Sequence, residues 1–166
     1  MNTEKITLRP LSADDQEQIL DILTSEIVNR TYMLPDFEKR EDAIPLFTRL
    51  MNLSNDGQRF VRCIDLNDTA IGYLNDVETE NGVIELGYVI HPGYHNRGYM
   101  TEALRLAIKD LFALGYRAVV CGAFEGNNAS LRVMEKAGMA PIEKVDIITY
   151  RGKDHRCFYR QIRNEE

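Results

Sequence analysis

The sequence predicts an α/β fold with a mixed, mostly antiparallel sheet of six to seven strands flanked by about four helices. Its 166 residues match the usual size of one domain, and we expect a single domain over residues 1–166. Short apolar segments with strand-like character are interleaved with segments whose apolar residues recur at helical spacing. One helical segment lies between two apolar strand segments, which predicts a single β-α-β crossover in an otherwise antiparallel sheet.

The N-terminal half begins with a strand and two helices. Ile6–Arg9 alternates apolar and polar residues, and Pro10 ends the strand. Apolar spacing and capping residues predict two helices, from a Ser12 or Asp14 cap to Leu23, and over Lys39–Leu53 with Pro45 near its start. Three strands then follow, over Phe60–Ile64, Ala70–Leu74 and Val83–Ile90. The Asn81-Gly82 pair favours a tight hairpin turn before the last of them.

The C-terminal half continues with a long amphipathic helix over Tyr99–Leu114, and Gly115 stands at its C-terminal end. The remaining predicted elements are a buried strand, a short helix and two strands, over Ala118–Ala123, Asn128–Ala137, Ile142–Tyr150 and His155–Ile162. The long helix connects the strands on either side of it, so it is the expected crossover.

Composition excludes several functional classes. The net charge of -6 and the pI of about 5.2 argue against a broadly basic nucleic-acid surface. No apolar run approaches the ~20 residues of a membrane span, and Met1–Pro10 lacks the apolar segment of a signal peptide. The three widely spaced cysteines form no metal-binding pattern and are typical of reduced thiols in the cytoplasm. We therefore expect a cytoplasmic protein with no metal and with neither a nucleic-acid nor a membrane partner.

The segment His91–Thr101 is the most informative part of the sequence. It joins a strand to the start of a long helix, where free backbone N–H groups and the helix dipole favour anions. It contains Arg97 and two histidines but no Asp or Glu, and Gly98 lets the backbone approach a ligand closely. Neither a Walker A loop nor a dinucleotide fingerprint fits its glycine spacing. The segment predicts a polyanion site, although an ordinary turn followed by a capped helix fits the same residues.

Two segments resemble motifs of a known family. Glu85–Ala103 resembles motif A of the GNAT N-acetyltransferases. Asn127–Met139 resembles motif B of their RimJ/RimL-type branch, the ribosomal-protein N-terminal acetyltransferases and their relatives, with the pattern Asn-x-x-Ser-x-Arg-Val-x-Glu-Lys-x-Gly. Ile6–Pro10 also fits, and Asp154–Tyr159 fits loosely. The resemblance covers nearly the whole chain and implies the GNAT fold.

This resemblance implies transfer of an acetyl group from acetyl-CoA, the acyl-donor cosubstrate, to a primary amine by direct attack in a ternary complex. The residues expected to contact the cofactor are Val89, Ile90, His95, Asn96, Arg97, Gly98, Tyr99, Met100, Thr101, Asn127, Arg132 and Lys136. His95 and Met100 depart from the family loop, which usually has Gln or Arg and then Gly or Ala at these positions. We expect Met100 to point into the core, because a flexible thioether fills irregular space. Arg132 and Lys136 share a helical face, where solvent exposure without a ligand is the alternative.

The reaction needs a neutral amine, and Glu85 is the candidate base. A lysine-type amine costs about 4.6 kcal/mol to deprotonate at pH 7, whereas an α-amino group costs only about 1 kcal/mol, so a weak or water-relayed base suffices for it. Glu85 shares a strand face with Gly87 and Val89, where burial is expected to raise its carboxyl pKa. The resemblance also places a glutamate here. The alternative is a solvated strand face.

Two further tasks are to stabilise the thioester oxygen and to release the CoA thiolate. The resemblance implies a backbone N–H near Val89 or Ile90 for the oxygen. The tyrosine that many GNAT enzymes carry in motif B falls at Met134, which cannot donate a proton, and the RimJ/RimL-type pattern offers Ser130 instead. Asn127 resembles the asparagine that binds the pantetheine arm. Helix capping or a first-turn position explains Ser130 and Asn127 equally well.

The acceptor site rests on position alone. In the family it is built from the first helices and the final hairpin, so Tyr32, Met33, Phe37 and Tyr150 are the candidates. We expect a peptide or protein α-amine as acceptor and a monomer or homodimer as the working form. The alternatives are a small-molecule amine (a polyamine, amino acid or antibiotic) and a non-catalytic CoA-binding module.

Overall fold

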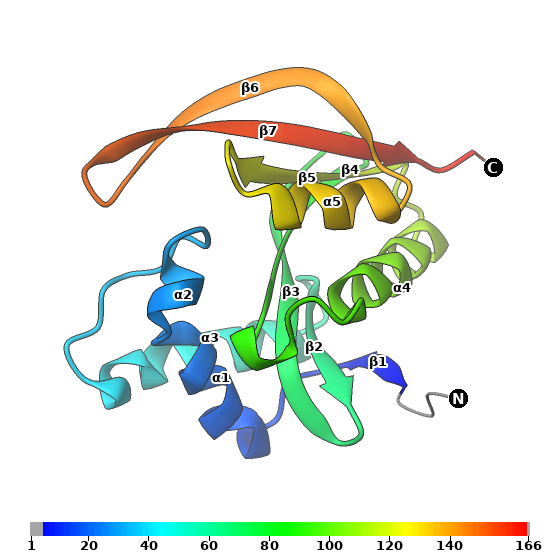
Figure 1. The fold of residues 1–166 in the computed structure, drawn as a ribbon. Coiled ribbons are helices and arrows are strands. Elements are labelled where there is room, and N and C mark those ends of the chain that lie inside the picture. Colours follow the sequence, from blue (N-terminus) through cyan, green and yellow to red (C-terminus); the bar gives the residue numbers. More distant parts are fainter. Residues whose placement is uncertain (1–4, 166) are drawn as a thin grey trace. The chain divides into compact units, whose positions relative to one another are not determined.

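The computed structural model of the chain describes residues 5–165. The expectation about the N-terminal segment falls partly on residues 1–4, outside the described part. The strands are β1 (Ile6–Arg9), β2 (Val61–Leu66), β3 (Thr69–Glu80), β4 (Val83–Ile90), β5 (Ala118–Phe124), β6 (Ala140–Tyr150) and β7 (Lys153–Arg163) (Figure 1). The α-helices are α1 (Gln16–Leu23), α2 (Glu26–Asn29), α3 (Ile44–Asn55), α4 (Tyr99–Ala113) and α5 (Asn128–Lys136). Short 3₁₀ turns cover Ala13–Asp15, Arg40–Ala43 and Pro92–Tyr94.

The seven strands form one mixed sheet in the order β1-β2-β3-β4-β5-β7-β6. Strands β4 and β5 are parallel, with register pairs from Val83↔Ala118 to Leu86↔Cys121. The pairs β1–β2, β2–β3, β5–β7 and β6–β7 are antiparallel. Helix α4 is thus the crossover between the parallel strands, and the expected α/β class with a mostly antiparallel sheet is confirmed.

The chain divides into two compact units. One holds Met1–Asn75 and Tyr88–Ala103, and the other holds Asp76–Gly87 and Leu104–Glu166. The hairpin formed by β3 and β4 contributes residues to both. A single domain over residues 1–166 stays a prediction.

The core of the first unit is an apolar cluster built from α1, α3 and the strands β2 and β3. The predicted stripe of α1 is confirmed, since Ile19, Leu20, Ile22 and Leu23 are at most 2% exposed. Helix α3 begins later than predicted, because a 3₁₀ turn over Arg40–Ala43 precedes it. Pro45 then stands in the first turn, where the missing N–H costs no helical hydrogen bond.

Helix α2 has no counterpart among the predicted elements. It is a single turn, and the Ser25 hydroxyl caps it by accepting a hydrogen bond from the backbone N–H of Val28 at 3.3 Å. Val28 is buried in the apolar cluster of the first unit. A helix this short leaves too few apolar residues for its period to be visible in the sequence.

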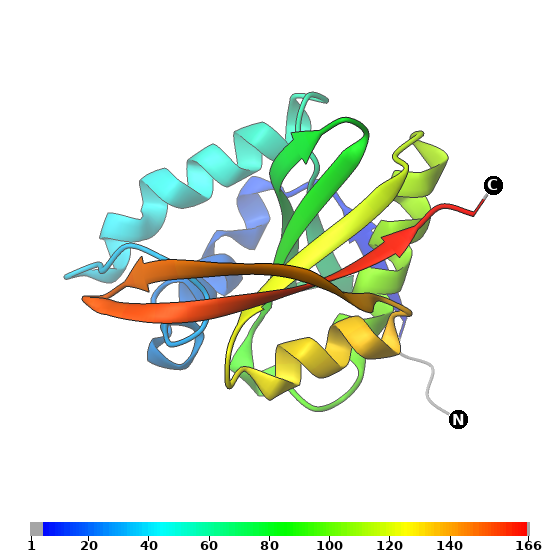
Figure 2. The same ribbon diagram turned by 90° about the horizontal axis from the view of Figure 1, so that it is seen from above.

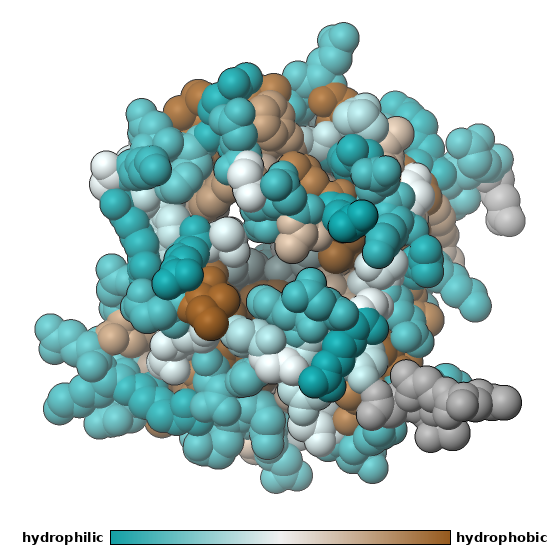
Figure 3. All heavy atoms as spheres, in the orientation of Figure 1, coloured by the Kyte–Doolittle hydropathy of each residue, from teal (hydrophilic) through white to brown (hydrophobic). Residues whose placement is uncertain are grey.

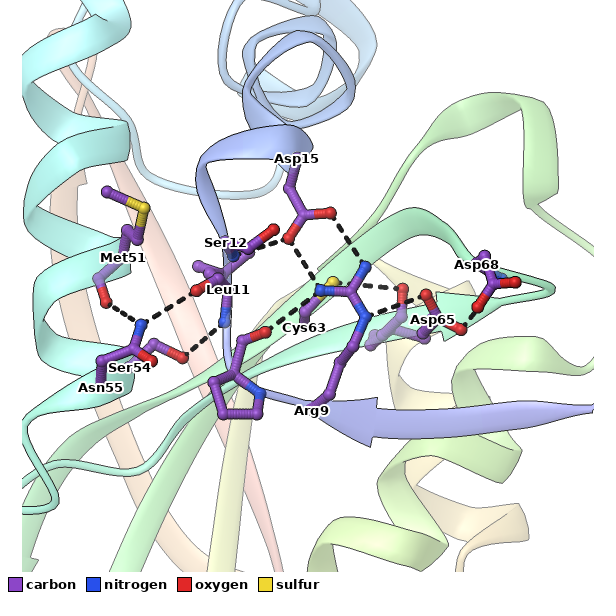
Figure 4. A network of polar contacts seen from close by, with 12 residues as sticks. Arg9, Leu11, Ser12, Asp15, Met51, Ser54, Asn55, Cys63, Asp65 and Asp68 are labelled. Atoms are coloured by element: carbon purple, nitrogen blue, oxygen red, sulfur yellow. Dashed lines mark hydrogen bonds and ion pairs between the residues drawn. The ribbon is translucent and has the colours of Figure 1, made fainter.

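An ion-pair network with two buried carboxylates joins β1, β2 and the turn before α1 (Figure 4). The Arg9 guanidinium donates to both carboxylate oxygens of Asp15, at 2.8 and 2.9 Å, and to Asp65 at 3.0 Å. Asp15 and Asp65 are 5% and 6% exposed. Burial raises the pKa of Asp15, but the hydrogen bonds from Arg9 and from Ser12 outweigh it and hold the pKa below its ordinary value.

We expect Arg9→Met to lower the free energy of unfolding by about 2 kcal/mol at pH 7, because two buried carboxylates lose their charged donor. Arg40→Met is the matched control, since Arg40 pairs with Glu17 and Asp21 at the surface and its loss costs at most about 1 kcal/mol. Urea unfolding at several pH values measures both. The folded-state pKa of Asp15 is lowered, so its stabilisation is present above the unfolded pKa and is lost as the pH falls through the folded pKa. The difference from wild type should therefore shrink in acid, and an equal effect of both substitutions would contradict this assignment.

The second unit is built on β5, on the long hairpin of β6 and β7, and on the helices α4 and α5. The core side of α4 is buried, as predicted, through Leu104, Ala107, Ile108 and Leu111. Helix α5 packs on β5 (Figure 2) and buries Met134 completely. No helix of the described residues is long and apolar enough to cross a membrane. Figure 3 shows that hydrophilic side chains cover most of the face seen there, with scattered apolar ones between them.

Candidate functional site

The loop between β4 and α4 belongs to the first unit and is shaped by hydrogen bonds within itself. The His91 ring accepts the N–H of Gly93 at 2.9 Å, and the Tyr94 N–H donates to the carbonyl of His91. The His95 N–H donates to the Pro92 carbonyl at 3.2 Å. The amides of Gly93, Tyr94 and His95 are therefore engaged inside the turn. Of the loop amides that the sequence offers for anion binding, only those after His95 remain candidates.

The backbone after His95 has the shape of an anion-binding turn. Asn96 and Gly98 have positive φ values of 61° and 80° on either side of Arg97. Successive N–H groups in such a conformation converge on one side of the chain and form a concavity suited to an anion. Helix α4 starts at Tyr99, directly after this turn, and the N–H groups of a helix N-terminus point toward the preceding residues. These amides and the helix dipole favour negative charge at the same point.

The side chains of this loop divide into an exposed and a buried group. His95, Asn96, Arg97 and Gly98 are exposed, whereas Tyr99, Met100 and Thr101 are 6%, 7% and 8% exposed. The expected burial of Met100 is confirmed. Its side chain therefore does not fill the exposed turn between Asn96 and Gly98.

The C-terminal end of β4 holds the loop through a hydrogen bond and packs closely against β3. The His95 ring donates through Nε2 to the carbonyl of Ile90 at 3.1 Å, which ties the loop to the strand. A Cβ on Gly72 of β3 would lie 2.3 Å from the carbonyl oxygen of Val89. Only glycine allows this close approach of the two backbones. Val89 and Ile90, both expected to contact the cofactor, thus lie on a strand end with a firmly held backbone.

Glu85 belongs to the second unit, at the position of β4 that pairs with Val120 of β5. Its side chain is partly buried. Burial raises the pKa of its carboxyl, the positive charge of Lys144 lowers it, and the charges of Glu78 and Asp146 raise it further. The net direction is upward, as expected for the candidate base.

Helix α5 of the second unit carries the motif B residues. The Asn127 side chain is the N-cap and accepts the backbone N–H of Ser130 at 3.2 Å. Ser130 is the third residue of the helix and is not its cap. The structure thus shows the cap position for Asn127 and the first-turn position for Ser130. Arg132 and Lys136 are exposed on the helix surface.

The four acceptor candidates fall in different units. Tyr32 and Phe37 pack against the apolar cluster of the first unit, and the Tyr32 hydroxyl donates to Asn75 at 2.9 Å. Met33 is 50% exposed. Tyr150 belongs to the second unit, where its ring centroid lies 6.2 Å from that of Phe124. The structure gives Tyr32, Phe37 and Tyr150 packing roles.

Sequence reasoning missed a second polar group of the second unit, formed by Tyr159, Asp146 and Lys144. The Tyr159 hydroxyl donates to Asp146 at 2.8 Å, and the Lys144 ammonium lies 4.4 Å from the centroid of the Tyr159 ring. The alternation of β6 places Lys144 and Asp146 on one face. That alternation was the available signal, but only the register with β7 shows which ring they meet.

The three cysteines are free and buried. Burial raises the pKa of each thiol, to about 12 at Cys63, so they are poor nucleophiles at neutral pH. Among the described residues, no group of three His, Cys, Asp or Glu side chains is arranged to hold a metal ion.

Comparison with known proteins gives a consistent assignment. Residues 5–140 match the model of the acetyltransferase (GNAT) domain. An uncharacterized N-acetyltransferase, YoaA of Bacillus subtilis (strain 168), is 26% identical over 144 residues, which cover 83% of this chain and 81% of that protein.

Solved structures share the fold along nearly the whole chain. A GNAT-family acetyltransferase from Bacillus anthracis superposes with a TM-score of 0.84 at 22% identity, covering 100% of this chain and 99% of that one. RimL, a ribosomal L7/L12 α-N-protein acetyltransferase in complex with coenzyme A, gives 0.83 at 16% identity, covering 98% and 95%. A spermidine N-acetyltransferase from Vibrio cholerae, in complex with CoA and spermine, gives 0.79 at 15% identity, covering 95% of each chain.

Proposed function

Because this chain belongs to the acetyltransferase (GNAT) family, we propose that it transfers an acetyl group from acetyl-CoA to a primary amine by direct attack in a ternary complex. The observation that carries the proposal is the turn at Asn96 and Gly98, which leads into a helix of 15 residues. The segment His91–Thr101 contains no carboxylate in a chain of net charge -6. A diphosphate is the ligand whose charge and shape match these amides.

Residues proposed to bind the cofactor occur in each of the two units. In the first unit, the amides of residues 96–101 bind the diphosphate, and the exposed Arg97 adds positive charge. In the second unit, Asn127 binds the pantetheine arm. Its Oδ1 accepts the cap hydrogen bond, and its Nδ2 group carries the donors that this role requires. The exposed Arg132 and Lys136 are proposed to meet CoA phosphates.

The chemistry is assigned to Glu85, to the end of β4 and to Ser130. Glu85 accepts a proton from the attacking amine, directly or through water, and its raised pKa brings it closer to the working pH. The backbone N–H near Val89 or Ile90 stabilises the thioester oxygen as negative charge builds on it. The Ser130 hydroxyl then donates a hydrogen bond to the CoA sulfur, so that the thiolate leaves more easily.

A peptide or protein α-amine is the proposed acceptor, and the exposed Met33 is the candidate acceptor-site residue that has no packing role in its unit. Deprotonating an α-amine at pH 7 costs only about 1 kcal/mol, so a weak base such as one partly buried carboxyl suffices. The structural similarity to RimL supports this choice. The similarity to a spermidine N-acetyltransferase supports a polyamine as the second candidate.

Release of free thiol from acetyl-CoA tests the function with three acceptors. These are a peptide with a free α-amine, the same peptide with an acetylated N-terminus and one lysine, and spermidine. Turnover on the first peptide alone supports the proposed acceptor, and turnover on spermidine alone supports the polyamine. Binding of CoA with no turnover on any amine would assign the chain as a non-catalytic CoA-binding module.

Ser130→Ala separates a catalytic serine from a structural one. The cap of α5 uses the backbone N–H of Ser130, which alanine retains, so the substitution keeps the N-cap of the helix. Turnover should fall about 10-fold through the loss of one hydrogen bond to the developing thiolate. Ser130→Thr keeps a hydroxyl and is the matched control that should retain most of the rate. A variant with normal turnover and a lowered melting temperature would return Ser130 to a purely structural role.

A further inference from the structure

The hairpin of β6 and β7 holds a lysine in a defined place. Tyr159 is 5% exposed, and its hydroxyl donates to Oδ2 of Asp146 at 2.8 Å. The Lys144 ammonium lies 3.9 Å from the same Oδ2 and 4.4 Å from the centroid of the Tyr159 ring. An ion pair and a cation–π contact therefore act on one ammonium group. The buried Tyr159 thus contacts Lys144 through its ring and holds the second partner, Asp146, through its hydroxyl.

Gly122 makes room for this arrangement. It pairs with Tyr159 in the β5–β7 register. A Cβ at Gly122 would lie 2.6 Å from Cε1 and 2.9 Å from Cδ1 of Tyr159, closer than real Cβ atoms come to a neighbouring atom. The edge of the Tyr159 ring therefore occupies the space that a side chain at Gly122 would need.

The same face of the sheet carries Glu85. Glu85 pairs with Val120, and Val120 and Gly122 are two residues apart on β5 and so point to the same side. Paired residues of neighbouring strands also share a side, which places Tyr159 there. All these residues belong to the second unit. Glu85 and the ring that carries Lys144 thus lie on one face, with β5 between them.

Several ionisable groups on β3, β5, β6 and β7 interact electrostatically with Glu85, although only β3 and β5 adjoin β4 in the sheet. They are Glu78 from β3, Cys121 from β5, Lys144 and Asp146 from β6, and Cys157 and Tyr159 from β7. The two-residue turn at Asn81-Gly82 places Glu78 directly across from Glu85, where like charges repel. Lys144 is the cation of this set. Burial raises the pKa of Glu85, and of the charges that act on it, that of Lys144 has the largest influence and lowers it.

We infer that Lys144, held by Asp146 and by the ring of Tyr159, is a positioning residue that acts through Glu85, as the positive charge on the same face of the sheet. This inference rests on the proposed function, in which Glu85 receives the proton of the acceptor amine. The ammonium offsets the repulsion from Glu78 and Asp146 and keeps Glu85 ionised at a lower pH than burial alone would allow. Without it, Glu85 would bind its proton more tightly and the base would be available only at higher pH.

The test compares the pH dependence of kcat/KM in Lys144→Met, Lys144→Arg and Lys153→Met. Lys153 is an exposed lysine of the same hairpin, so its replacement controls for the loss of one charge. We expect Lys144→Met to lose about threefold in kcat/KM at pH 6 and little at pH 8.5, because its acid limb moves to higher pH. Lys144→Arg should restore the wild-type profile. An acid limb that stays in place in Lys144→Met, or that moves equally in Lys153→Met, would overturn the inference.

A second measurement needs no enzymatic activity. The ¹³C resonance of the Glu85 carboxyl group, assigned with Glu85→Gln, follows its titration in the free protein. The midpoint should lie at higher pH in Lys144→Met than in wild type, and Lys144→Arg should return it. If the midpoint moves while the chain acetylates no amine, the inference stands and the proposed function fails. If turnover is normal and the midpoint does not move, the inference fails and the proposed function stands.

Discussion

Gly98→Glu is expected to abolish binding of acetyl-CoA while the chain stays folded. Gly98 is exposed and a Cβ there would meet no atom within 4 Å, so a larger side chain has room. The φ of 80° costs a residue other than glycine about 1–2 kcal/mol, which a stable unit tolerates. The new carboxylate would stand among the amides proposed to bind the diphosphate. We expect the Kd for acetyl-CoA to rise at least about 100-fold, through repulsion and displacement of the ligand.

Calorimetric titration with acetyl-CoA and a thermal melt measure the two effects separately. Gly57→Glu is a matched control, because Gly57 also has a positive φ, of 77°, and open space around it, but lies at the end of α3. It carries the same strain and the same charge away from the loop, so it should bind the cofactor normally. Gly98→Ala adds the strain without the charge and should weaken binding much less. Wild-type affinity in Gly98→Glu would place the diphosphate elsewhere on the chain.

Glu85→Gln is expected to lower kcat at least about 100-fold near pH 7 while leaving the Kd for acetyl-CoA unchanged, because glutamine cannot accept a proton. The acid limb of the wild-type profile should disappear, since the rate is lost as the pH falls through the raised pKa of Glu85. With an α-amine acceptor the deficit should shrink toward pH 9, where the amine is already neutral. Steady-state rates over pH 6–9 measure the effect, and a wild-type rate throughout that range would remove Glu85 from the mechanism.

Stability gives an independent check on the same variant. The folded-state pKa of Glu85 is raised, so the charged form is disfavoured by folding above that pKa. Glutamine removes this penalty, and we expect Glu85→Gln to be at least as stable as wild type at pH 7. Glu78→Gln, the control on the neighbouring strand, also removes a carboxylate but keeps the base. It should retain turnover, which separates loss of a base from loss of a charge.

The sequence alone predicted the elements whose apolar period is clear. The bounds of β4 agree with the predicted Val83–Ile90, and α4 ends one residue before the predicted Leu114. Strand β3 extends to Glu80, beyond the predicted Leu74. The prediction ended too early because Val77–Glu80 is exposed and its sequence shows no apolar alternation. The loop before α4 was also visible in the sequence, since its lack of carboxylates and its glycine are local features.

The tertiary structure alone decided which side chains meet. Arg9 and Asp65 are 56 residues apart, and Tyr159 reaches Asp146 across a hairpin whose register shifts between Pro141 and Val145. Periodicity along one strand records which face a residue takes, but it carries no information on the partner that faces it from another strand. The turn proposed to bind the diphosphate could therefore be predicted from the residues that form it, whereas the charges around Glu85 depend on the register of strands brought together only by folding.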